Sequence, residues 1–401
     1  MGLVIDVDAH FEPGKEWLED FPDLAKRLPK LDTGALAVKS AFGDLVDSIP
    51  EYRRPPINEL LPPGLLQLFA QEKADEKGRK LEFEAQSMMG KADAPARLKW
   101  MDAQGIDVQN VICLSGMSYL HSIEDCGLRQ EVVRAVNNWL YDTCARGGRG
   151  RLLPVTNLDC SDLDWAIGEM GRMRKLGSRL VLVPGAPVNG MSPAHPEWDK
   201  FWSAVTDNGM IALFHVGFGR IQFEAGWSNT DGDATLLRQF GCNFHHFEPQ
   251  LFLSALTLGG VFERHPTLTV LTAEVGTGWL PSLLHQIDDR ASDRAQLWLG
   301  KWKYPMKPSE YIKRNVRGTP LAWGMDQPLE VIMQQLPDDM IVFSSDFPHF
   351  EGYQDPMGYY ALMLERMDQR KRDLFLGDSI RSAFARMGDP FVFAPEEAVV
   401  G

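Results

Sequence analysis

The sequence lacks the features of several protein classes, beginning with paired cysteines. Five cysteines occur, an odd number, and none forms a Cys-x-x-Cys pair. This usage favours neither a disulfide framework nor a thiolate zinc site. No run of about 18 apolar residues occurs, and no apolar N-terminal segment follows a basic leader, so we expect neither a membrane span nor a signal peptide. We therefore expect a cytoplasmic protein with reduced cysteines.

Positive charge is also scarce. The chain has 41 lysines and arginines against 55 aspartates and glutamates, which gives a formal net charge of −14. Nucleic acids and anionic membranes select for basic surfaces, so this charge argues against both as partners. Phosphate-binding loops are missing too, because no Gly-x-Gly-x-x-Gly follows the first expected strand and no Walker-type loop occurs. The composition favours a site for a small molecule.

Strand-like and helix-like segments alternate along most of the 401 residues. Apolar runs predict eight strands, which start near residues 3, 107, 152, 180, 210, 268, 315 and 340. Helical periodicity is found around residues 96–104, 132–140, 163–170, 198–205, 251–263 and 328–336. Continuous apolar strands are typical of a parallel sheet that is covered on both faces. The pattern predicts an α/β fold, a (β/α)8 TIM-like barrel in a single domain over residues 1–401. The runner-up is an open doubly wound sheet.

Two stretches interrupt this alternation. Residues 14–95 are irregular, with proline-rich turns at 50–63, and residues 217–250 form a long connection. We interpret 14–95 as an insertion after the first strand that folds as a lid or an oligomer arm, and 217–250 as a second insertion after the fifth strand. Loops that follow strands lie at the catalytic end of such a barrel, so we expect both to cover its mouth.

The first strand, LVIDVDAHFEP at residues 3–13, ends in ionisable side chains. Alternation along a strand sends Asp8 and His10 to one face, while Ala9 and Phe11 point to the other. A carboxylate oxygen and an imidazole nitrogen on one face can bind one divalent cation. The structural alternative is an aspartate that caps the next element and a histidine that is only hydrogen-bonded.

Further ionisable residues end other predicted strands. His215 ends the fifth strand, Glu274 the sixth and Asp346 the eighth. The carboxyl ends of all strands meet at the active-site face of an eight-stranded barrel. Together with the pair on the first strand, these residues predict a metal site there.

Five segments resemble a known family. They are VDAHFEP at 7–13, ARLKWMDAQGIDVQNV at 96–111, GGVFERHP at 259–266, KPSEY at 307–311 and SSDFPHFEG at 344–352. With them the chain resembles the amidohydrolase superfamily, and within it the amidohydrolase-2 or ACMSD-like group of metal-dependent hydrolases and decarboxylases. The resemblance implies one catalytic divalent metal ion, with zinc the first choice and manganese the second, held by Asp8, His10, His215 and Asp346.

The chain departs from the family pattern at two positions. Most members carry His-x-His or Glu-x-His on the first strand, so Asp8 is a shorter variant and Glu12 is the substitute ligand. Decarboxylases of the group are expected to have a histidine at the end of the sixth strand, where this chain has Glu274. An ionised glutamate can serve as a base or as a metal ligand. Its structural alternative is an ion pair with a neighbouring strand.

The first functional hypothesis is a metal-dependent carboxy-lyase that acts on a small aromatic or unsaturated carboxylic acid. The alternative is a metal-dependent hydrolase of a C–C, C–N or ester bond that uses metal-activated water, with Asp346 or Glu274 accepting the proton. A third hypothesis is a barrel that binds ligands without catalysis. His349, which follows Asp346 by three residues, would orient a ligand or else simply begin a helix.

Residues for substrate contact are expected in the loop after the fifth strand. Arg220, Phe223 and Trp227 would supply aromatic walls and a clamp for a carboxylate. The alternative is ordinary loop polarity and packing. The expected partners are a small-molecule substrate and further copies of the chain, in a homo-oligomer that is a dimer or larger.

Overall fold

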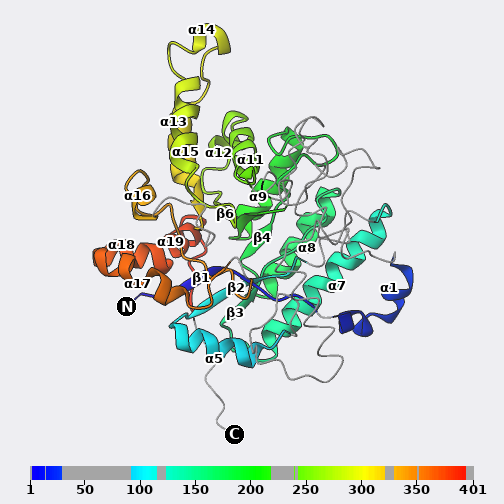
Figure 1. Ribbon diagram of the computed structural model, residues 1–401. Coiled ribbons are helices and arrows are strands. Elements are labelled where there is room, and N and C mark those ends of the chain that lie inside the picture. Colours follow the sequence, from blue (N-terminus) through cyan, green and yellow to red (C-terminus); the bar gives the residue numbers. More distant parts are fainter. Residues whose placement is uncertain are drawn as a thin grey trace.

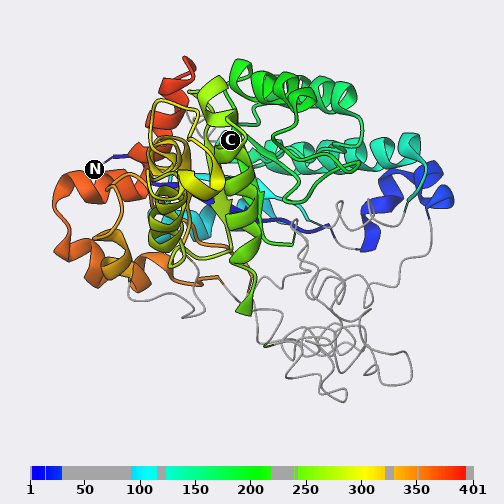
Figure 2. The ribbon, with the colours of Figure 1, turned by 90° about the horizontal axis from the view of Figure 1, so that it is seen from above.

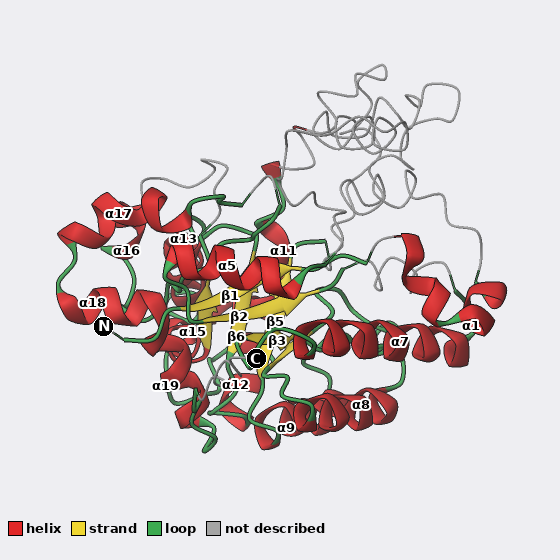
Figure 3. Ribbon diagram, turned by 90° about the horizontal axis from the view of Figure 1, so that it is seen from below, coloured by secondary structure: helices red, strands yellow, loops and turns green. Residues whose placement is uncertain are grey.

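The structure is a computed structural model, and it describes residues 2–13, 15–28, 92–114, 123–217, 239, 243–320, 329–349 and 352–393. Strands form its centre and helices lie around them (Figure 1, Figure 3). Within these residues no helix combines the length and the apolarity needed to cross a membrane.

Every paired strand runs parallel to its neighbour. One sheet has the order β1-β2-β3 and the other the order β4-β5-β6-β7. The strands are β1 Ile5–His10, β2 Val108–Ile112, β3 Leu152–Pro154, β4 Leu180–Leu182, β5 Ile211–His215, β6 Val270–Ala273 and β7 Val316–Gly318. All seven coincide with strands predicted from apolar runs, because such runs are buried on both sides of a parallel sheet.

Isolated parallel bridges join the two sheets and an eighth segment, residues 340–347, into a ring. The bridges pair Thr156 with Val181 between β3 and β4, Gly318 with Ile341 after β7, and Phe347 with Ala9 of β1. The eighth segment therefore lies between β7 and β1, and the order of strands returns to its start. This is the eight-stranded parallel barrel that the alternation of strands and helices predicted.

The eighth segment is less regular than the strand expected from Met340 to Ser344. The amide of Phe343 donates to the carbonyl of Phe375 at 2.9 Å instead of to a strand partner. Phe375 lies in η6, a π-helical turn at Leu374–Asp378. The hydrogen-bond ladder is broken at this point, so the segment pairs only through single bridges.

Helices follow the strands and cover the outside of the barrel (Figure 1). They are η1 Lys15–Asp20, α1 Pro22–Arg27, α5 Ala94–Gln104, α7 Cys126–Ala145, α8 Leu163–Lys175, η4 Pro196–Trp198, α9 Asp199–Asp207, α11 Phe247–Leu258, α12 Val261–Arg264, α13 Leu280–Arg290, α14 Gln296–Leu299, α15 Pro308–Asn315, α16 Leu329–Met333, α17 Pro356–Arg366, α18 Gln369–Asp373 and α19 Ser379–Arg386. The helix predicted at 251–263 is divided into α11 and α12, because Gly260 has a left-handed φ of 74°.

The two predicted insertions are described only in part. In the first, α1 lies beside α7 (Figure 2), and Arg27 of α1 forms an ion pair with Glu131 of α7. Residues 29–91 and nearly all of 218–242 lie outside the described residues. The lid, the oligomer arm and their place over the barrel mouth therefore remain predictions.

The interior of the barrel is apolar toward its amino-terminal end. One core cluster contains residues of β1, β2, β4, β5 and β6, the residue after β3 and one residue of the eighth segment: Ile5, Val7, Ile112, Val155, Leu180, Leu182, Ile211, Leu213, Leu271, Ala273 and Val342. Three side chains of α19 join the same cluster, namely Ile380, Ala383 and Phe384. Leu3, which precedes β1, also packs against it, so α19 closes the amino-terminal end of the barrel. The apolar cluster therefore fills this end of the interior.

Gly260 is expected to tolerate alanine less well than Gly105. Both have a left-handed φ, 74° and 67°, which costs a residue with a Cβ about 1–2 kcal/mol. A Cβ on Gly260 would also collide with the ring of Tyr304, whereas a Cβ on Gly105 meets nothing within 4 Å. Urea denaturation should show a loss of about 1–2 kcal/mol for Gly105→Ala. For Gly260→Ala the loss should be larger by about 1–3 kcal/mol, the usual effect of overpacking. Equal losses would contradict this account of the GGVFERHP segment.

Candidate metal centre

Six ionisable side chains meet at the carboxyl-terminal end of the barrel. Asp8 and His10 come from β1, His215 ends β5, Glu274 follows β6, and Asp346 and His349 belong to the eighth segment and the turn after it. All six are buried, and none is more than 6% exposed. The structure thus places the predicted ligands and catalytic residues at one end of the barrel, but the four predicted ligands do not share one compact set of donor atoms, because His215 and Asp346 belong to different sets.

A bulge in β1 explains why Asp8 points into the barrel. Asp6 pairs with Gln109 and Ala9 pairs with Val111, so β1 has one residue more than β2 over this stretch. Ile5 and Val7 belong to the apolar interior. Strict alternation from them would turn Asp8 outward, and the extra residue turns it inward instead. Asp8 and His10 then share one face, as the sequence predicted.

Glu274 lies at the centre of the three histidines. Its Oε1 is 3.0 Å from Nε2 of His10, 3.1 Å from Nε2 of His215 and 3.4 Å from Nδ1 of His349. The rings of His10 and His349 are stacked, with centroids 3.8 Å apart. A single carboxylate oxygen therefore faces three imidazole nitrogens that come from different segments.

Asp8 and Asp346 complete the cluster from two sides. Oδ1 of Asp8 is 3.3 Å from Nε2 of His10 and 3.7 Å from Nε2 of His215. Oδ1 of Asp346 is 3.3 Å from Nε2 of His10 and 3.0 Å from Nδ1 of His349. The cluster contains two overlapping sets of four residues, and within each set all donor atoms lie within 4.8 Å of one another. The first set is Asp8, His10, His215 and Glu274, and the second is His10, Glu274, Asp346 and His349.

The cluster fits a divalent cation because the carboxylates of its two aspartates accept no hydrogen bonds from the described residues. None of the four carboxylate oxygens of Asp8 and Asp346 has a hydrogen-bond donor in bonding geometry among the described residues, although imidazole nitrogens lie 3.0 to 3.7 Å away. Buried carboxylates without hydrogen bonds are strongly unfavourable unless they meet a cation. Oxygen and imidazole nitrogen donors suit a divalent metal ion.

The pKa shifts within the cluster also indicate that it requires a cation. Burial and the negative charge of Glu274 raise the pKa of Asp346 to about 8. Burial acts to lower the pKa of His10, but contacts with Asp346, Asp8 and other carboxylates raise it well above its usual value. Burial and the charge of His10 act to lower the pKa of His349, yet contact with Asp346 raises it to about 10. Without a cation the cluster gathers protons, and a bound divalent ion would replace them.

Two residues of the cluster have strained backbone conformations. Glu274 and Asp346 have φ of 55° and 52°, in the left-handed region that residues with a side chain rarely adopt. Such strain persists only where the surrounding structure holds it, and it is concentrated at functional sites. At both positions the conformation directs a carboxylate toward the histidines.

Glu12, the substitute for Asp8, is not part of either donor set. Its Oε1 accepts a hydrogen bond from the amide of Leu114 at 2.9 Å. The same oxygen lies 3.8 Å from Nδ1 of His10, the ring nitrogen that faces away from the cluster. The geometry therefore favours Asp8 in the cluster and places Glu12 behind His10. Arg220, Phe223 and Trp227, the predicted substrate contacts, lie outside the described residues.

The sequence reasoning missed Asp6, which is fully buried behind the cluster. Its carboxylate accepts hydrogen bonds from the amide and hydroxyl of Ser345, the residue before Asp346. Burial raises the pKa of Asp6 to about 6, against the effect of these hydrogen bonds. The sequence did contain a signal for this residue, since Asp6 is a second aspartate inside an apolar strand, two residues before Asp8.

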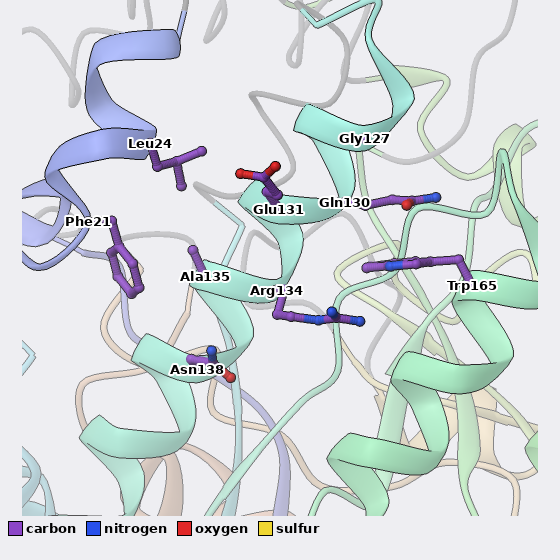
Figure 4. Close-up of a pocket in the computed structure, with 9 residues that line it drawn as sticks. All are labelled: Phe21, Leu24, Gly127, Gln130, Glu131, Arg134, Ala135, Asn138 and Trp165. Atoms are coloured by element: carbon purple, nitrogen blue, oxygen red, sulfur yellow. The ribbon is translucent and has the colours of Figure 1, made fainter.

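A separate cavity of about 340 Å³ lies in the outer layer of helices (Figure 4). It is lined by residues of α7, including Arg134, together with Trp165 of α8 and Leu24 of α1. None of the six clustered residues lines it. The candidate metal centre and this cavity are therefore distinct.

Comparison with known proteins agrees with the resemblance found in the motifs. No curated protein gives a significant match to the sequence. The sequence profile of a family described as Amidohydrolase matches residues 5–383.

Similar solved structures include the amidohydrolase map2389c from Mycobacterium avium subsp. paratuberculosis K-10, with a TM-score of 0.67 and 21% identity over 96% of this chain and 99% of that one. The 2,6-dihydroxybenzoate decarboxylase from Rhizobium has a TM-score of 0.61 and 18% identity over 96% of this chain and 99% of that one. The dihydroxybenzoic acid decarboxylase from Polaromonas sp. JS666, solved with manganese and the inhibitor 2-nitroresorcinol, has a TM-score of 0.60 and 16% identity over 96% of this chain and 97% of that one. At these identities the likeness establishes the fold alone.

His215→Ala and Asp346→Asn are each expected to lose most of the bound metal and to keep the fold. Each removes one donor from the cluster, and asparagine tolerates the left-handed backbone at position 346. Elemental analysis after metal loading would measure the loss, and circular dichroism would check the fold. His265→Ala is the matched control, since His265 contacts Asp199 at 3.2 Å outside the cluster. Full metal retention in both variants would contradict the assignment.

Proposed function

Because the chain belongs to the amidohydrolase family, we propose that it is a metal-dependent carboxy-lyase acting on a small aromatic or unsaturated carboxylic acid. The observation that carries the proposal is the buried group of three carboxylates and three imidazoles at the carboxyl-terminal end of the barrel. This is the end where enzymes with this architecture bind their substrates. The similarity in fold to decarboxylases of hydroxylated benzoic acids supports the choice of reaction.

The proposed ligands of the ion are Asp8, His10, His215 and Asp346. A bound divalent ion would supply Lewis-acid polarisation of the substrate carboxylate and of a neighbouring oxygen. We propose zinc or manganese, since a mixture of imidazole and carboxylate donors suits both. Zinc is our first choice from the sequence, and the manganese bound in the Polaromonas decarboxylase supports the second.

We assign proton transfer to Glu274 and His349. When a carboxy-lyase breaks the bond to the carboxylate, carbon dioxide leaves and the carbon that keeps the electron pair must receive a proton. Nδ1 of His349 lies 3.4 Å from Oε1 of Glu274, so a proton can pass between them with little movement. His349 also lies 3.0 Å from Oδ1 of Asp346 and would help to orient that carboxylate.

The second candidate function is hydrolysis of a C–C, C–N or ester bond. In that reaction a water molecule would attack the scissile carbon, and Asp346 or Glu274 would accept its proton. The same cluster supports this chemistry, because both carboxylates face the position between the histidines. A barrel that only binds ligands is the weakest candidate, since it would bury three carboxylates without using them.

We also propose that the active protein is a cytoplasmic homo-oligomer, a dimer or larger, with a small molecule as its substrate. Arg220, Phe223 and Trp227 remain the proposed contacts to that substrate.

Carbon dioxide release should separate the candidate reactions. Protein loaded with zinc or with manganese would be incubated with a panel of hydroxylated benzoic acids, and in parallel with a panel of esters and amides. We expect carbon dioxide and the decarboxylated product from at least one acid. Cleavage of esters or amides without carbon dioxide release would favour the hydrolase, and metal binding without any reaction would favour the binding protein.

Glu274→Gln is expected to lower kcat by about 10² to 10⁴, the usual contribution of a positioned acid or base. The substitution keeps the shape of the side chain and removes its ability to carry a proton. Metal content, measured on the same sample, should stay close to that of the wild type. Glu263→Gln is the control, because Glu263 accepts a hydrogen bond from Tyr311 in the outer layer of helices. Parallel loss of metal would make Glu274 a ligand, and a fall of less than threefold would exclude it from proton transfer.

A further inference from the structure

Arg97 of α5 is completely buried behind the metal centre. Its guanidinium packs against two aromatic rings, 4.4 Å from the centroid of Phe11 and 4.7 Å from that of Phe347. Phe11 follows His10 in the chain, and Phe347 follows Asp346. The guanidinium therefore packs against the residues next to two proposed ligands that are distant in the sequence.

Hydrogen bonds fix the peptide of His10 on both sides. Nη2 of Arg97 donates to the carbonyl of His10 at 2.7 Å. The amide of His10 donates to the carbonyl of Phe347 at 2.8 Å. The backbone of this ligand is thus held between α5 and the eighth segment.

The other terminal nitrogen of Arg97, Nη1, is connected through two side chains to the backbone next to Asp346. Nη1 donates to Oε1 of Gln109 at 3.0 Å, and Nε2 of Gln109 donates to Oδ2 of Asp6 at 2.8 Å. Asp6 in turn accepts from the amide of Ser345 at 3.0 Å and from its hydroxyl at 2.5 Å.

The carboxylate of Asp6 and the hydroxyl of Ser345 also accept hydrogen bonds from neighbouring backbone amides. Asp6 also accepts from the amide of Asp8, at 3.2 Å. The hydroxyl of Ser345 accepts from the amide of Phe347 at 3.1 Å. The residues on both sides of Asp346 are therefore held, and this supports its left-handed φ of 52°.

The charges of this network are arranged unusually for a buried arginine. Among the described residues, no carboxylate lies within ion-pair distance of Arg97, and its nearest charge partner, Asp6, is reached through the amide of Gln109. A buried charge without a direct counter-ion is costly. A packing role alone could be filled by an apolar side chain at no such cost.

We propose that Arg97 is a positioning residue which, through Gln109 and Asp6, fixes the backbones of β1 and of residues 345–347 so that their ligands face the same ion. The inference rests on the proposed metal site. In this proposal, residues on the outer face of the strands orient the metal ligands on the inner face. Residues that orient metal ligands usually contribute about 10- to 100-fold to metal affinity or activity.

The test compares two buried arginines. Arg179, directly before β4, is 7% exposed and lies 4.3 Å from the ring of Phe384, but it belongs to the amino-terminal end of the barrel. Dissociation constants for zinc and for manganese would be measured by competition with a chelator, on protein whose fold is checked by circular dichroism. Arg97→Met is expected to raise the dissociation constant about 10- to 100-fold. Arg179→Met should lower stability and leave metal affinity within twofold of the wild type.

Two further variants keep the test decisive if Arg97→Met does not fold. Gln109→Met leaves Arg97 in place and cuts its connection to Asp6, so it should also weaken metal binding. Arg97→Lys keeps the charge but loses the planar fork, so it should recover only part of the affinity. Unchanged affinity in folded Arg97→Met or Gln109→Met, beside a wild type that binds metal, would overturn the positioning role alone. A wild type that binds neither metal would overturn the proposed function and this inference with it.

Discussion

The burial of three carboxylates at one point of the barrel is the constraint on which the rest of the site depends. Carboxylates that are removed from water repel one another and lose their hydration, and histidines can neutralise them only by gaining protons. The raised pKa values of His349 and Asp346, about 10 and about 8, express this conflict. A divalent cation would resolve it, because one ion would attract all the carboxylates and leave the imidazoles free to act as neutral donors.

The donors must also be aimed, and the backbone does this at locally unfavourable positions. The bulge in β1 turns Asp8 inward, and left-handed φ angles turn Glu274 and Asp346 toward the histidines. Conformations of this kind persist where hydrogen bonds and packing hold them. Around Asp346 these contacts come from Asp6 and Arg97, which lie on the outer face of the strands. Hydrogen bonds and packing on the outer face of the strands thus hold the strained backbone of residues whose side chains point into the barrel.

The two ends of the barrel are separated in chemistry. The amino-terminal end is closed by α19 with apolar side chains, and the carboxyl-terminal end holds the ionisable cluster. The eighth segment connects the two, since its first half joins the apolar interior and its second half carries Asp346. A barrel can therefore keep one stable core and change its reaction through residues at one end.

The sequence by itself determined the order of strands and helices and which ionisable residues end the strands, because apolar periodicity and strand ends are local properties. It predicted that Asp8, His10, His215 and Asp346 would meet, since parallel strands that close a barrel present their ends together. It left Asp8 and Glu12 as alternatives, and only the bulge and the contact of Glu12 with the Leu114 amide separate them.

It could not predict the roles of Asp6 and Arg97 at all. Asp6 contacts Ser345 across 339 positions of sequence, and contacts of that kind depend on how the strands and α5 pack. The ionisable residues at the strand ends were therefore determined by local pattern. Their orientation was decided by tertiary structure, because it depends on hydrogen bonds between segments that meet only when the barrel closes.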